Sequence, residues 1–229
     1  MVSLFFSGID AIFAIFFCFV ALGISIYSYK VYTLSSLRNA KFFSIGFFML
    51  AIAYFIWAVI DIFVLSGTLK NLNYLLTISP LTESFIALMA FITSYVLGLS
   101  TLAYTVVKVH KRSLFILIFS LSFLGIGLSS DITLSFFLIT SIIFVFLSAS
   151  YLKEYMLKKN IYTLTTFVAF LFLTLANIQF LFSTLNSWFY ITGHLSAFIG
   201  YLLIFISLAT IIKNGRQKEK QTRNNEGHS

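Results

Sequence analysis

The chain has 229 residues, of which 60% are hydrophobic and only 10% are charged. Soluble domains carry about 25% charged residues, so this composition excludes an ordinary soluble protein. The formal net charge of +8 does not indicate nucleic-acid binding, because the basic residues are scattered over several gaps without a recognition motif. A single cysteine, Cys18, excludes a framework of disulfides within the chain.

Seven apolar stretches follow one another, each close to the roughly 20 residues that a helix needs to cross a bilayer. They cover residues 4–29, 42–65, 81–107, 113–130, 132–151, 161–185 and 188–212. The first stretch is too long for a signal-peptide core and has no basic segment before it, so we expect it to be a retained span. The sequence therefore predicts an all-α, multi-pass bundle of seven transmembrane helices over residues 1–212. The remainder, 213–229, is polar and basic and is predicted to be a short, disordered cytoplasmic tail.

Basic residues occupy alternate gaps between these stretches. Fourteen of the fifteen Lys and Arg residues lie in the first, third and fifth gaps and after the seventh stretch, and Lys70 is the exception. Short loops rich in Lys and Arg remain cytoplasmic, so we expect the N-terminus outside and the C-terminus inside the cell membrane. The short stretch 113–130 is needed as a span, because one crossing over 113–151 would place two basic clusters on opposite sides.

Local signals mark the ends and contacts of the predicted helices. Asp131 follows a Ser-Ser turn and is expected to cap the fifth helix, and Pro80 is expected at the first position of the third. In the seventh helix, Gly193, Ala197 and Gly200 recur at spacings of four and three residues. This pattern predicts a face of small residues that lets another helix approach closely.

Strongly polar side chains within the spans gather at one depth. Asp10, Asp61, Gln179 and His194 each lie about 20 positions from the nearest inner basic residue, or ~30 Å along a helix, near the outer edge of the hydrocarbon core. Aromatic residues share helix faces with them, since Tyr54 and Trp57 precede Asp61, and Tyr190 precedes His194, at helical spacings. The candidate ligand-pocket residues are Asp10, Tyr54, Trp57, Asp61, Glu83, Asn177, Gln179, Tyr190 and His194.

Two interpretations of this polar layer remain open. Polar groups in membrane helices normally face protein or a water-filled cavity, which predicts an outward-open vestibule. Alternatively, each side chain ends its span at the hydrated interface and the aromatic residues form an outer belt. The vestibule interpretation carries a specific expectation: Asp61 and His194 approach one another, because the first, second and last helices of a sequential bundle are neighbours.

Metal and catalytic chemistry find little support. His194 with Asp10, Asp61 and Glu83 is the combination that suits a zinc-like ion, but a single His without a second ligand at helical spacing is not a motif. Residues 188–212 contain no Lys to which retinal could attach. The sequence also lacks the paired His residues that bind haem, a Gly-x-Ser-x-Gly motif and a P-loop. We therefore expect no cofactor and no enzymatic activity.

One part of the chain resembles a known class of proteins. Residues 188–195 (WFYITGHL) and 197–203 (AFIGYLL) are similar to the closing helix of seven- or eight-helix membrane sensor modules that precede prokaryotic histidine kinases and cyclic-nucleotide enzymes. Residues 29–32 (YKVY) are similar to their first inner loop. The resemblance implies that His194 is a ligand or pocket residue. This sequence departs from the class because no kinase, cyclase or coiled coil follows Ile212.

These observations predict a sensor- or receptor-like membrane module that binds a small cation, a proton or a lipid-like molecule in an outer pocket. Its partners are then the lipid bilayer and a separate signalling protein, with no nucleic acid. A small-solute transporter or channel that uses the same vestibule is the first alternative. A structural or assembly protein without a ligand is the second.

Overall fold

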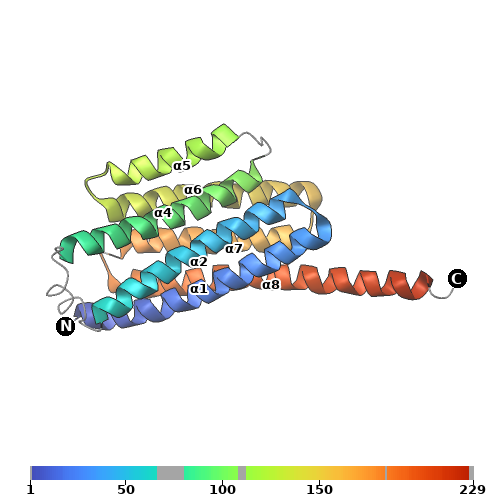
Figure 1. The fold of residues 1–229 in the computed structure, drawn as a ribbon, viewed down its shortest axis with the longest axis horizontal. Helices are drawn as coiled ribbons and strands as arrows, with labels where there is room; N and C mark the ends of the chain where they lie inside the picture. The colour runs from blue at the N-terminus through green and yellow to red at the C-terminus, as the bar shows by residue number, and fades with distance from the viewer. Residues whose placement is uncertain (1, 66–79, 108–111, 184, 227–229) are drawn as a thin grey trace.

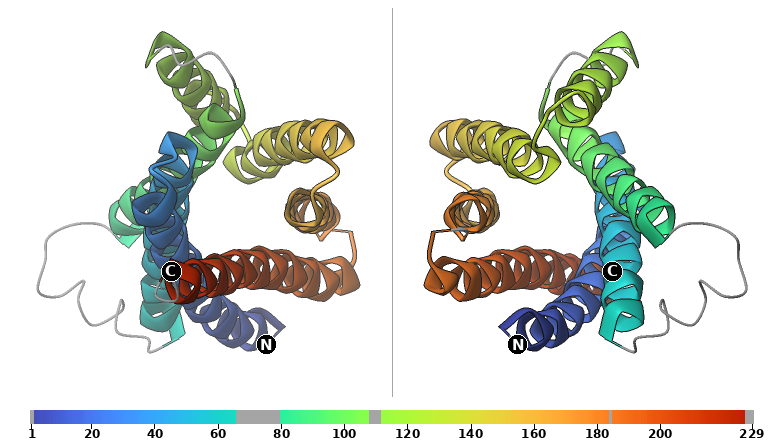
Figure 2. Two further views of the ribbon diagram at one scale, coloured as in Figure 1. Left: turned by 90° about the vertical axis from the view of Figure 1, so that its right-hand side faces the viewer. Right: turned by 90° about the vertical axis from the view of Figure 1, so that its left-hand side faces the viewer.

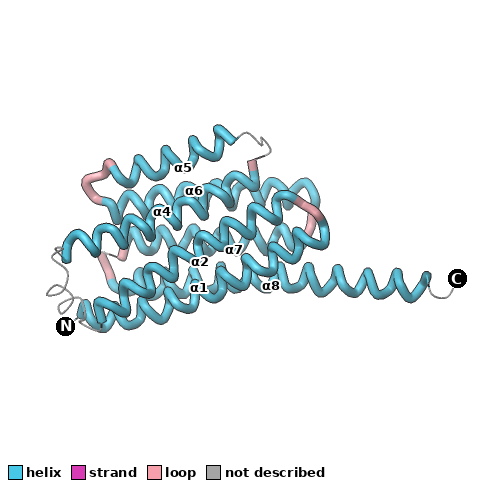
Figure 3. The backbone as a smooth tube through the Cα atoms, viewed as in Figure 1, coloured by secondary structure: helices cyan, strands magenta, loops and turns pink. Residues whose placement is uncertain are grey.

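The computed structural model describes residues 2–65, 80–107, 112–183 and 185–226. Within these ranges the chain is helical, apart from short connections (Figures 1 and 3). The helices are α1 (Val2–Ser35), α2 (Arg38–Leu65), α4 (Pro80–Val106), α5 (Arg112–Gly127), α6 (Ile132–Lys158), α7 (Ile161–Phe182) and α8 (Ser187–Glu226). The predicted all-α class is confirmed.

Six of these helices are long and apolar enough to cross a membrane, which makes the chain a multi-pass membrane protein. The exception is α5, an apolar helix of 16 residues. In Figure 1, α4 ends at one end of the bundle and α6 begins at the other, and α5 runs back along the bundle between them. The predicted helix after residue 112 therefore exists, while its crossing of the membrane remains a prediction.

The six long helices form a closed ring. Helices α1, α2, α4, α6, α7 and α8 contact one another in that order, and α8 also packs against α1 (Figure 2). Short connections force consecutive helices to be neighbours, and contact between the first and last helices closes the ring, as expected from the sequence. By contrast, α5 lies outside the ring against α4 and α6. Burial of polar side chains inside the ring therefore depends on six helices and not on seven.

The helix ends show how local sequence sets the connections. The Asp131 side chain accepts a hydrogen bond from the Leu134 backbone N–H at 3.0 Å and caps α6, as predicted. Pro80 is the first residue of α4, also as predicted. The last helix differs from expectation: α8 continues to Glu226, through most of the segment 213–229 that we predict to be disordered. That segment is rich in Lys, Arg, Gln and Glu, which favour the helix even without apolar packing.

Small residues bring neighbouring helices close together. A Cβ atom added at Gly193 would lie 2.8 Å from the Phe180 ring, and one added at Gly200 would lie 2.9 Å from the Ala169 carbonyl oxygen. The predicted small-residue face of the last helix is thus the face that packs on α7. An equally close crossing, which we did not predict, joins α2 to α4: a Cβ added at Gly98 would lie 2.8 Å from the Gly46 carbonyl oxygen.

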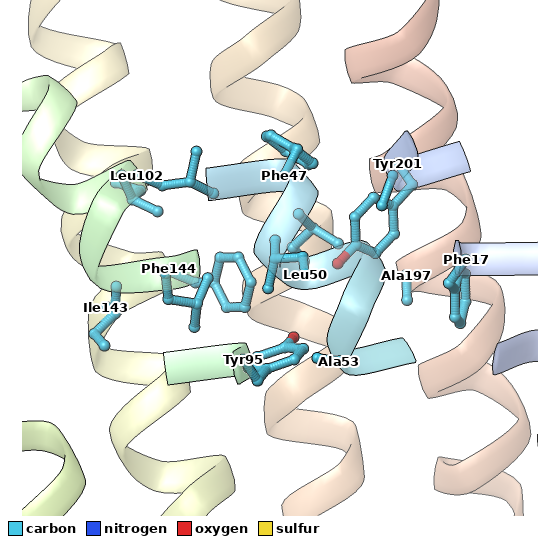
Figure 4. Close-up of a cluster of buried hydrophobic side chains, with 14 of the residues drawn as sticks. Phe17, Phe47, Leu50, Ala53, Tyr95, Leu102, Ile143, Phe144, Ala197 and Tyr201 are labelled. Carbon is cyan, nitrogen blue, oxygen red and sulfur yellow. The ribbon is translucent and has the colours of Figure 1, made fainter. Parts of the chain in front are cut away.

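Large apolar side chains fill the interior of the ring towards the end where the described basic residues lie. Figure 4 shows Phe47 and Leu50 of α2, Leu102 of α4 and Phe144 of α6 meeting there. All four are 0–1% exposed to solvent. The described basic side chains are exposed. Most belong to the last turns of α1 and α6 or the first turns of α2 and α5, which meet at this end of the bundle (Figure 1), the end that the sequence predicts to be cytoplasmic.

Candidate functional site: a polar and aromatic cavity

The other half of the ring, away from the basic residues, contains a cavity of about 170 Å³. Its walls include residues from each of the six ring helices, and none of them belongs to α5. Six of the nine candidates predicted from the sequence line this cavity: Asp10, Tyr54, Trp57, Asn177, Tyr190 and His194. The structure thus brings together residues that are up to 184 positions apart in the sequence, from Asp10 to His194.

Aromatic rings form most of the cavity wall. Besides the predicted Tyr54, Trp57 and Tyr190, the lining includes rings that the sequence analysis did not select: Phe17, Phe91, Tyr95, Phe136, Phe137 and Phe180. These rings contact one another. Trp57 lies 4.9 Å from Phe91 between ring centroids, and Tyr95 lies 5.2 Å from Phe136. The chain has 29 Phe residues, and nothing in the sequence separates the rings that face the cavity from those that face lipid.

His194 pairs with an acid and is surrounded by aromatic rings. Its Nε2 atom lies 3.2 Å from Oδ1 of Asp10, within ion-pair distance, although the two atoms are not aligned as a hydrogen bond. The imidazole stacks on Phe13 at 4.6 Å and meets the edges of Tyr190 and Phe180 at 4.7 and 4.9 Å. Asp10 and His194 side chains are 17% and 14% exposed. An Asp–His contact between α1 and α8 therefore lies at the ring closure, beside three aromatic rings.

Asp61 is not the acid in direct contact with His194. The acid within ion-pair distance of His194 is Asp10, since α1 packs directly against α8 and lies beside α2. Asp61 is 8% exposed and lies within electrostatic range of Asp10, but it is not among the lining residues. Its Oδ2 atom is buried without a hydrogen-bond partner in the described part of the chain. Two acidic side chains thus lie near one another on adjacent helices.

Hydroxyl and amide side chains lie at the inner boundary of the cavity. The Tyr54 and Tyr201 hydroxyls are 2.9 Å apart, and the Tyr95 ring meets the Tyr54 ring edge-on at 5.9 Å between centroids. Asn177 accepts a hydrogen bond from the Thr140 hydroxyl at 2.9 Å. Figure 4 shows the Tyr95 and Tyr201 hydroxyls inside the ring. These hydrogen bonds join α2 to α8 and α6 to α7 below the Asp10–His194 contact.

The remaining predicted residues lie elsewhere or outside the description. Gln179 does not line the cavity, and its side-chain oxygen accepts a hydrogen bond from Ser196 at 3.0 Å. The side chain of Glu83 lies outside the described residues. Among the described residues, no three His, Cys, Asp or Glu side chains are grouped closely enough to hold a metal ion. The combination of His194, Asp10, Asp61 and Glu83 as metal ligands therefore gains no support.

Several polar atoms at this site lack partners within the described structure. They are Oδ1 of Asp10, Oδ2 of Asp61 and both ring nitrogens of His194, none of which makes a hydrogen bond. Native proteins satisfy the great majority of buried polar atoms through protein or water contacts. Comparison with known proteins offers no homologous site for interpretation, because no protein-family model, curated protein or solved structure matches this chain.

Proposed function

We propose that this chain is a small-molecule-binding module of the cell membrane, sensor- or receptor-like, without catalytic activity of its own. The observation that carries the proposal is the cavity of about 170 Å³ that all six ring helices build around Asp10 and His194. Buried polar atoms without protein partners are costly unless water or a ligand satisfies them. A cavity lined by Asp10 and His194, whose buried polar atoms make no hydrogen bond, is better suited to a ligand than to structural packing.

The proposed orientation puts this cavity on the outer side. The described basic side chains, such as Lys30 and Lys159, lie at the opposite end of the bundle, and loops rich in Lys and Arg remain cytoplasmic. In this arrangement α5 serves as the fourth of seven spans. At 1.5 Å per residue its 16 residues reach ~24 Å, which is shorter than a hydrocarbon core of ~30 Å. To cross, α5 needs either a locally thinned bilayer or flanking residues that extend to the interfaces.

A transporter or channel is the competing function, and the packing favours binding over transport. A solute leaving the cavity towards the basic end would meet Phe47, Leu50 and Phe144, all at most 1% exposed. Below them the buried polar side chains include Ser28, Ser100 and Ser207, whose hydroxyls lack partners and form no continuous described chain. Uptake of a solute by proteoliposomes that contain the purified protein would favour the transporter over the proposed sensor.

A sensor must transmit ligand binding in the cavity to an output protein. The resemblance of residues 188–203 to prokaryotic sensor modules supports a signalling role, with a separate protein as the output partner. The last helix is suited to this role because it carries His194 at the cavity and continues to Glu226, beyond the other helices at the basic end (Figure 1). A ligand that displaces His194 from Asp10 would alter the contact of α8 with α1.

Tryptophan fluorescence tests the cavity directly. The chain has two Trp residues: Trp57 lines the cavity and Trp188 is 70% exposed. In a Trp188→Phe protein we expect acrylamide, a small neutral quencher, to reach Trp57 in the folded bundle. Ala14 also lines the cavity, so Ala14→Leu should fill part of it and reduce this quenching. Quenching that is unchanged by Ala14→Leu would contradict the proposal. A Trp57→Phe protein, which retains only Trp188, serves as the control. Ala14→Leu should leave the acrylamide quenching of Trp188 unchanged.

A further inference from the structure

We propose that the ligand of this cavity is a small organic cation with an ammonium group, held by the Asp10 carboxylate and by the faces of the surrounding aromatic rings. This inference rests on the proposed function and specifies the chemical class of the ligand. It follows from three properties of the cavity: the sign of its charge, the nature of its walls and its size.

The acidic side chains near the cavity, Asp10 and Asp61, outnumber its one imidazole, that of His194. Asp10 is the one carboxylate among the lining residues, and Asp61 lies within electrostatic range of it. None of the lining residues is Lys or Arg, and the described basic residues lie at the other end of the bundle. An anionic ligand would therefore meet a carboxylate with only a protonated His194 to compensate. A cation would instead give the buried Asp10 oxygen a positively charged partner; that oxygen lies 3.2 Å from the His194 Nε2 atom but makes no hydrogen bond.

The walls suit a cation of low charge density. The face of an aromatic ring attracts a cation within about 6 Å, and recognition of quaternary ammonium groups by aromatic cages uses this attraction. The cavity combines Trp57, the ring type that binds cations best, with Tyr54, Tyr95 and Phe91. The rings enclose the same space that Asp10 enters, so a positively charged head group would meet π faces and a carboxylate together.

The size of the cavity limits the ligand. A cavity of about 150 Å³ holds one benzene molecule, so about 170 Å³ accommodates a compact ligand of similar or slightly larger size. A bare divalent ion would leave most of this space empty and would find no group of three acidic or His ligands among the described residues. A neutral apolar molecule would fill the space but would offer no polar partner to the Asp10 oxygen, which makes no hydrogen bond.

Two molecules of the same shape and different charge provide the test. Choline carries a quaternary ammonium group, and 3,3-dimethyl-1-butanol replaces its nitrogen with carbon, so the two differ in charge and hardly in shape. We expect millimolar choline to raise the melting temperature of the full-length protein in detergent and to change the fluorescence of Trp57 in the Trp188→Phe background. The same concentration of 3,3-dimethyl-1-butanol should do neither.

Matched variants connect the effect to the site. Asp10→Asn should weaken choline binding about tenfold or more, because it removes the charge and retains the shape of the side chain. Asp131→Asn is the control: Asp131 lies in the exposed turn before α6, outside the lining residues, and Asn caps a helix as well as Asp does. A Trp57→Leu change should also weaken binding, and Trp188→Leu at the exposed position should not. Melting curves without a probe show whether each variant folds.

The outcomes separate the two proposals. If choline and its neutral analogue bind equally well and Asp10→Asn affects neither, the inference of a cationic ligand is overturned, while the proposal of a binding cavity stands. Binding of neither probe would also overturn the cation inference, and acrylamide access to Trp57 would then decide whether the cavity itself survives. If Asp10→Asn and Asp131→Asn weaken choline binding equally, choline binds outside this cavity and the cation inference is overturned; acrylamide access to Trp57 again decides whether the cavity survives.

Discussion

Substitution of Gly98 tests a close helix crossing in the ring, which lies at the junction of α2 and α4. A Cβ atom at position 98 would lie 2.8 Å from the Gly46 carbonyl oxygen and 3.0–3.1 Å from Leu50 side-chain atoms. The oxygen belongs to the backbone of a helix, so the clash is relieved only if the two helices move apart. Overpacking of this kind costs about 1–3 kcal/mol. Replacing Gly with Ala within a helix offsets this by at most about 1 kcal/mol.

We therefore expect Gly98→Ala to lower the free energy of unfolding by up to about 2 kcal/mol. Gly98→Val should destabilise the protein more, because it adds two further methyl groups and has a lower helix propensity than Ala. Unfolding in detergent micelles, followed by the loss of helical circular dichroism with added denaturant, measures the change. Since α2 and α4 also carry Tyr54 and Tyr95, the same variants should weaken ligand binding at the cavity.

Two other glycines serve as controls. A Cβ added at Gly127 would meet no atom within 4 Å, so Gly127→Ala should be neutral or stabilising. At Gly23 the nearest atoms belong to the Phe205 ring, which can turn away, so Gly23→Ala should have an intermediate effect. If the free energy of unfolding of Gly98→Ala is equal to or above that of Gly127→Ala, the reasoning is refuted, because the close approach of α2 and α4 would then not affect stability.

Three further predictions concern buried hydrogen bonds and topology. Thr140→Val keeps the shape of the side chain but removes the hydrogen-bond donor to Asn177, so it should lower the unfolding free energy by about 1–3 kcal/mol. A change of less than about 0.5 kcal/mol, the scale of an ordinary surface substitution, would contradict the structure. Ser25 and Ser44 exchange hydrogen bonds at 3.0 and 2.8 Å between α1 and α2, so Ser25→Ala should lower the unfolding free energy by about 1 kcal/mol. The same denaturant assay compares it with Ser35→Ala, which removes a hydroxyl that bonds to Val31 within its own helix. Reporter fusions after Lys70 or Asp131 should give the signal of an extracytoplasmic reporter; a cytoplasmic signal at either would refute the seven-span orientation.

Much of the fold follows from physical rules that act on single stretches of the chain. The bilayer requires long apolar helices, which allowed the all-α class and the approximate helix bounds to be predicted from residues 4 to 212, while the crossing by α5 remains a prediction. The Asp131 cap and the Gly193–Gly200 face depend on local spacing, and both are confirmed. The polar layer was also predictable, because a residue such as His194 stands out in an apolar background. Six candidates meet in one cavity for the same reason.

The rest depends on how the helices face one another, and the sequence carries little of that information. Lipid is as apolar as the protein interior, so membrane helices lack the one-sided hydrophobic pattern that orients soluble helices. Tyr95 and Phe91 line the cavity, while Phe19 is 69% exposed, and their sequence surroundings are equally apolar. Similarly, the sequence indicated acids at one depth on α1 and α2, but only the packing of α1 on α8 gives Asp10, and not Asp61, as the partner of His194.

Cysteine accessibility in intact cells tests the central claim, an outward-facing cavity inside the ring, most directly. In a Cys18→Ala background, Ala14→Cys introduces a thiol in the cavity wall and Ala103→Cys introduces one in the inner half, where Ala103 is 2% exposed. We predict that a membrane-impermeant methanethiosulfonate reagent carrying a trimethylammonium group, added outside, modifies position 14 and leaves position 103 unmodified. Excess choline should slow the reaction at position 14. No reaction at position 14, or equal reaction at both positions, would contradict an outward-facing cavity.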